Sequence, residues 1–71
     1  MTRRFEFVGG SSAKFWEVTH DGSFVTVRFG RLGTDGQLVN KEFAGPAEAG
    51  KHADKLIAQK SGKGYVECAL R

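Results

Sequence analysis

The sequence predicts an α+β fold in which a small antiparallel β-sheet of four to five strands, connected as a meander, packs against one α-helix. Three features of the sequence predict it. Apolar and polar residues alternate along several short segments, glycine-rich turns separate these segments, and a helical pattern follows Pro46. A chain of 71 residues builds a single hydrophobic core, so we expect one domain from residue 1 to residue 71.

Two turns separate the first three expected strands. Arg3 to Val8 places Phe5 and Phe7 on one face, with the two-residue period of a half-buried strand. Asp21-Gly22 then predicts a type I′ hairpin between strands at 14–20 and 24–31. If the loop consists of those two residues, the cross-strand pairs are Trp16 with Val27, Val18 with Val25, Phe15 with Arg28 and Lys14 with Phe29.

The second half of the chain predicts another strand, the helix and a short last segment. Gly33 to Gly36 is a turn, and Gln37 to Phe43 reads as a fourth strand. Pro46 suits the first position of a helix that runs to Gln59 or Lys60 and closes at Ser61-Gly62. Tyr65 to Leu70 is a fifth strand or a tail laid on the sheet. The expected core contains Phe5 or Phe7, Trp16, Val18, Val25, Val27, Phe43, Ala53, Leu56 and Ile57.

The composition limits the classes of function. A single cysteine forms no intramolecular disulfide and offers no zinc-finger spacing, so we expect a reducing, cytoplasmic compartment. The N-terminus lacks the apolar run of a signal peptide, and no stretch reaches membrane-spanning length, so we expect no membrane association. A net charge of +3 favours an anionic partner, though only weakly.

Catalytic and metal-binding patterns are missing from the sequence. We interpret His20 and His52 as surface residues and Cys68, which follows Glu67, as a half-buried structural thiol. The glycines at 30, 33 and 36 do not form a Walker loop, because Gln37 and a strand follow where that loop needs Lys-Ser/Thr and a helix. We therefore expect no enzymatic activity, no bound metal and no cofactor.

One cluster of residues does suggest chemistry. Arg28-Phe29-Gly30-Arg31 ends a strand with a ring, a glycine and two cations. A ring can stack on a sugar or base while neighbouring cations meet phosphates. Lys14 adds a third cation if it lies opposite Phe29.

This cluster and several other segments resemble the WGR domain family, which is named for a Trp-Gly-Arg tripeptide. The family is known from poly(ADP-ribose) polymerases and from bacterial proteins similar to the molybdate metabolism regulator. The resemblance covers nearly the whole chain, and its fold is an antiparallel sheet with one helix packed across it. The matching segments are Lys14-Phe15-Trp16, Phe29-Gly30-Arg31-Leu32-Gly33, Gly36-Gln37, Phe43, Lys55-Leu56-Ile57 and Lys60-Ser61-Gly62-Lys63-Gly64-Tyr65.

The resemblance implies a role in recognising DNA ends or breaks. In the polymerases the family tryptophan packs on sugar at a strand terminus, near basic and polar groups that approach the phosphate. Here Phe29 stands at that position and offers a smaller face without an indole N–H. The nucleic-acid-binding residues implied for this chain are Lys14, Phe29, Gly30, Arg31, Lys63 and Tyr65.

Structural interpretations of the same residues remain open. Phe29 is alternatively the last ring of the core, Arg31 a side chain that fixes the turn through backbone carbonyls, and Tyr65 a ring partly buried on the sheet. We expect a stand-alone, monomeric, non-catalytic module that binds nucleic acid, DNA rather than RNA. The alternative is a protein–protein interaction adaptor that docks through the same strand ends or through a sheet edge.

Overall fold

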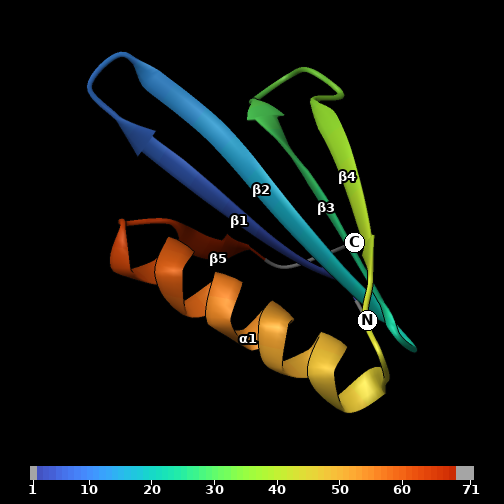
Figure 1. Ribbon diagram of the computed structural model, residues 1–71. Helices are drawn as coiled ribbons and strands as arrows, with labels where there is room; N and C mark the ends of the chain where they lie inside the picture. Colours follow the sequence, from blue (N-terminus) through green and yellow to red (C-terminus); the bar gives the residue numbers. More distant parts are fainter. Residues whose placement is uncertain (1, 69–71) are drawn as a thin grey trace.

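The computed structural model describes residues 2–68, which fold into five antiparallel strands and one helix (Figure 1). The order of the strands in the sheet is β4-β3-β2-β1-β5, so the first four form a meander and the last returns beside the first. This arrangement confirms the predicted α+β fold. The elements are β1 Thr2–Gly9, β2 Ser12–Asp21, β3 Phe24–Arg31, β4 Gln37–Glu42, α1 Pro46–Gly62 and β5 Val66–Cys68.

The β2–β3 hairpin forms where it was predicted, but its register is shifted by two residues. Asp21 pairs with Phe24, so the loop is Gly22-Ser23 and not Asp21-Gly22. Gly22 has a φ of 59°, and no non-glycine residue in the described chain has a positive φ, which fits a type II′ turn and excludes type I′. The pairs predicted from a type I′ turn were therefore wrong. The observed pairs are Lys14 with Arg31, Phe15 with Gly30, Trp16 with Phe29 and Val18 with Val27.

The faces of the sheet were predicted correctly, because a shift of two residues leaves every side chain on its original side. The helix-facing side buries most of the expected core, with several predicted residues packed at its margin. Phe5, Trp16, Val18, Val25 and Ala53 are buried, together with Ala49. Val27, Phe43, Leu56 and Ile57 are partly buried against them. Phe7 is half-buried and packs instead on Tyr65, with ring centroids 5.5 Å apart.

The other face of the sheet carries a buried ring that the sequence analysis did not place in the core. Phe15 is 1% exposed, although no helix covers this face. The guanidinium groups of Arg4 and Arg28 lie over its ring, 4.7 and 5.4 Å from the centroid. Glu17 bridges the two arginines. The charged side chains, together with Gly36, which lies against the same ring, thus bury Phe15. Strand alternation had assigned Phe15 to the face opposite Trp16, for which the sequence indicated no covering element.

The end of α1 brings the helix and the sheet together at one end of the molecule. The helix runs through Gly62, and its closing left-handed glycine is Gly64, with a φ of 98°, not Gly62 as predicted. The amide N–H of Tyr65 donates to the carbonyl of Lys60 at 3.1 Å. Chain reversal here turns β5 back onto β1. The last two residues of the predicted 65–70 segment lie outside the described chain.

Candidate functional site

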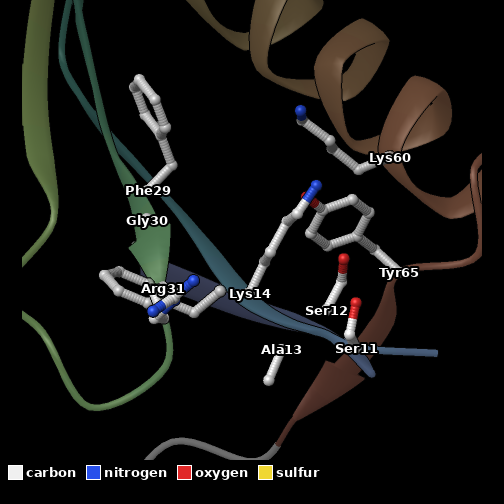
Figure 2. A pocket seen from close by; sticks show the side chains of 10 residues that line it. Ser11, Ser12, Ala13, Lys14, Phe29, Gly30, Arg31, Lys60 and Tyr65 are labelled. Atoms are coloured by element: carbon white, nitrogen blue, oxygen red, sulfur yellow. The ribbon is translucent and has the colours of Figure 1, made fainter. Parts of the chain in front are cut away.

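The predicted site residues gather where β2 begins and β3 ends, beside the C-terminal turn of α1 (Figure 2). Lys14 and Arg31 are direct cross-strand partners and therefore lie on the same face of the sheet. They line a pocket of about 430 Å³ together with Phe29, Gly30 and Tyr65. Lys63, the sixth predicted residue, lines an adjoining depression of about 330 Å³ that it shares with Lys14 and Tyr65.

Phe29 is an accessible ring at the margin of the core. Its side lies toward the helix, opposite Trp16, yet the residue is 37% exposed. The ring therefore does not simply close the core, which was the alternative interpretation of the sequence. An exposed aromatic face among cations is suited to stacking.

Arg31 and Gly30 shape the turn through the backbone. The carbonyl of Arg31 accepts hydrogen bonds from the amide N–H of Thr34 at 3.1 Å and from its hydroxyl at 2.7 Å. Over residues 2–68 the guanidinium group itself forms no hydrogen bond or ion pair. Gly30 allows close packing, since a Cβ there would lie 2.8 Å from the Cα of Gly36.

Lys60 belongs to the site although it was not among the predicted residues. Its ammonium group lies 5.2 Å from the ring centroid of Tyr65 and 5.8 Å from that of Trp16. Burial, and then the nearby Lys63 and Lys14 cations, lower its pKa. The spacing of residues along the helix could have placed Lys60 at this site. Lys60 follows Ala53 by seven residues, two helical turns, and so falls on the packing face.

The site cations differ from the other arginines in having no acidic partner. Arg3, Arg4 and Arg28 all form ion pairs, with Glu67, with Glu6 and Glu17, and with Glu17 respectively. In the described part of the chain no carboxylate pairs with Lys14, Arg31, Lys60 or Lys63. These four residues define the cation cluster. Its charge is left for an external anion.

Among the described residues, no group of metal-binding side chains converges on this site, and the thiol of Cys68 lies outside it. Among residues 2–68 no three His, Cys, Asp or Glu side chains are grouped so as to hold a metal ion. Cys68 lies on β5, where burial and then the nearby Glu6 carboxylate raise the pKa of its thiol, which disfavours the reactive thiolate. His52 packs against the ring of Phe43, with centroids 4.8 Å apart. No described helix is long and apolar enough to cross a membrane.

A shallow pocket with unpaired cations and an exposed ring, carried on a five-stranded sheet with one helix, defines a small binding module. The chain belongs to the WGR domain family, whose model matches residues 1–70. This match confirms the resemblance found in the sequence. WGR domains are a family of nucleic-acid-binding modules.

Bacterial relatives contain a matching segment within longer proteins. The chain is 39% identical over 67 residues to protein YfeS and 42% identical over 67 residues to protein YehF, both of Escherichia coli. Each match covers 94% of this chain but only 28% and 24% of those proteins. A crystal structure of a Bacteroides fragilis protein matches with a TM-score of 0.95 and 49% identity, over 97% of this chain and 20% of that one.

Proposed function

We propose that the chain is a non-catalytic module that binds nucleic acid and recognises DNA at ends or breaks, through phosphate contacts and ring stacking. The observation that carries this proposal is the cation cluster around the exposed ring of Phe29. Unpaired Lys and Arg side chains bind phosphate oxygens without regard to sequence. The ring of Phe29 stacks on a sugar or base that a strand terminus leaves uncovered.

Ends are favoured over continuous duplex because a continuous stack shields its base faces. A break exposes a sugar, a terminal base pair and a phosphate at one place, which matches a ring placed among cations. The smaller face of Phe29, compared with the family tryptophan, gives a weaker stack. We therefore expect modest affinity.

A titration of the purified chain with labelled DNA of one sequence tests this function. The arms are a blunt duplex, a nicked duplex and a covalently closed circle, with a matched RNA duplex as a further arm. We expect the blunt and nicked forms to bind more tightly than the closed circle and the RNA. Equal affinity for closed and broken DNA would remove end recognition, and no binding at low salt would remove the whole proposal.

A second candidate function is a protein–protein interaction adaptor, and one observation favours it. Strand β4 is an edge strand whose residues are all exposed. Leu38 and Val39, with 67% and 52% of their surface exposed, add apolar side chains to the free backbone edge. Such an edge can pair with a strand of another protein. The adaptor function becomes the better explanation if the chain binds no nucleic acid. The chain itself is expected to be monomeric.

A further inference from the structure

A second depression, here called the β4 slot, lies between α1 and the β3–β4 half of the sheet. Its volume is about 320 Å³, at the lower end of the roughly 300–1,000 Å³ of small-molecule sites. Apolar side chains from three strands line it: Trp16, Val27, Phe29 and Val39.

The slot exists because the helix does not cover the whole sheet. In Figure 1 β4 lies away from the helix. The close contacts of α1 are with β2 and β3. Phe29 and Val39, whose positions face the same side of the sheet as the helix, are therefore 37% and 52% exposed.

The polar groups around the slot are cationic or neutral. Lys41 and Lys60 stand at its margin, and Gln59 and His52 contribute groups that can donate or accept hydrogen bonds. No carboxylate from residues 2–68 lines it. An apolar floor with a basic margin fits an occupant that has a flat apolar body, polar edges and an attached negative charge.

The slot is continuous with the site of the cation cluster. Phe29 and Lys60 line both the slot and the larger pocket. In Figure 2 the side chain of Lys60 extends from the helix into the space between Phe29 and Tyr65. A phosphate held by the cluster would thus lie beside the entrance of the slot.

From this continuity we propose that the β4 slot binds one unpaired nucleobase, whose attached phosphate lies in the cation cluster. This inference rests on the proposed nucleic-acid binding and adds a preference for an end with an unpaired nucleotide over a blunt end. The base enters beside Phe29, covers Val27 and Val39, and turns its polar edge toward Gln59.

The test compares two DNA hairpins that differ in a single base. One carries a one-nucleotide adenine overhang, and the other carries an abasic analogue that keeps the phosphate. We expect the base to tighten binding by about 5- to 150-fold, the range of one base–aromatic stack. Trp16, the single tryptophan of the chain, lines the slot, so its fluorescence should change more with the base-bearing hairpin than with the abasic one, which perturbs it only through Lys60.

A pair of neighbouring variants locates the effect. Val39→Phe fills the slot and should abolish the gain from the base while leaving affinity for the abasic hairpin unchanged. Leu38→Phe adds the same ring on the opposite face of β4 and should keep the gain. Overhangs on the 5′ and 3′ strands are tested separately, and either polarity supports the proposal.

The outcomes separate this inference from the proposed function. Equal binding of both hairpins, with the same change in Trp16 fluorescence for each, overturns the base slot, leaves DNA binding intact and points to an apolar protein side chain as the occupant. A gain that survives Val39→Phe also overturns it. Failure of both hairpins to bind overturns the inference and the proposed function together.

Discussion

At the scale of single residues, the glycines of the family motif allow close packing of the backbone, because they have no Cβ atom. Gly30 faces the loop that follows β3, and a Cβ at this position would meet the Cα of Gly36 at 2.8 Å. Gly36 in turn has a φ of 71° and packs over the buried ring of Phe15. The motif thus joins an exposed ring and a cation without an acidic partner in the described chain to a tightly packed turn.

Gly30→Ala should destabilise the chain by about 1–3 kcal/mol, because backbone and not a flexible side chain must move to admit the new methyl group. A thermal or urea melt measures the loss. Gly62→Ala is the matched control. Nothing lies within 4 Å of its added Cβ, and the residue is helical, so alanine should be neutral or stabilise by up to about 1 kcal/mol. Equal unfolding free energies for the two variants would show that the backbone at Gly30 and Gly36 is not tightly packed.

The residues of the site could be predicted from sequence only in part. Phe29 and Arg31 were identified from the motif, and Lys14 from the family resemblance and from a predicted pairing with Phe29. That pairing was wrong, but Lys14 pairs with Arg31 instead, and the structure brings all three to one pocket. Lys60 was missed because a lysine in a helix is usually solvated. Only its spacing of seven residues from Ala53 indicated that it lies on the side of the helix that packs on the sheet. Whether any of these residues binds nucleic acid stays a prediction.

At the scale of elements, the sequence predicted strands and faces better than it predicted pairs. Alternation identifies the face of Trp16 or Val25 whatever the register. The register itself depends on which two residues form the turn, and Asp21-Gly22 and Gly22-Ser23 are both plausible from composition. The helix boundary was two residues too early for a similar reason, since Gly62 and Gly64 are equally suitable as caps.

A charge network links the three central strands on the side without the helix. Glu17 of β2 accepts hydrogen bonds from Arg4 of β1 and Arg28 of β3. Burial raises the pKa of Glu17, but the two arginines outweigh it, and the net pKa is lowered. A carboxyl group with a lowered pKa in the folded state stabilises the fold above its unfolded pKa, about 4.3. That stabilisation is lost as the pH falls through the folded pKa.

Glu17→Gln should therefore cost about 1–3 kcal/mol near neutral pH, since it breaks two partly buried ion pairs. The difference from the native chain should shrink as the pH falls below the unfolded pKa of Glu, where the native carboxyl is protonated as well. Urea melts across this range provide the measurement. Glu6→Gln is the control, because Glu6 makes a single ion pair, with Arg4, and its side chain is more exposed than that of Glu17. A constant difference at every pH would show that Glu17 acts by packing alone.

At the scale of the whole molecule, charge is distributed in two distinct ways. On the side without the helix, arginines and glutamates neutralise one another over Phe15. At the end of the groove between helix and sheet, the cation cluster has no such partners in the described chain. A modest net charge of +3 therefore understates the local positive potential at the site.

Binding should weaken with salt in proportion to the phosphates that the cation cluster contacts. Two to four contacts predict a log–log slope between about −1.8 and −3.6 on duplex DNA. Lys14→Ala and Arg31→Ala should each flatten the slope by up to about one unit, because each removes one phosphate contact. Phe29→Ala should weaken binding with the slope nearly unchanged, because stacking releases no counterions.

The matched control for these slopes is Lys51→Ala, which removes the same charge from the exposed side of α1, away from the pockets. Its affinity and slope should stay close to those of the native chain, and each variant's melt shows whether the fold is intact before its affinity is interpreted. If Lys51→Ala flattens the slope as much as Arg31→Ala, binding is governed by net charge alone. If neither Arg31→Ala nor Lys14→Ala changes binding, the cluster is not the contact surface, and the adaptor function of the β4 edge becomes the better explanation of the fold.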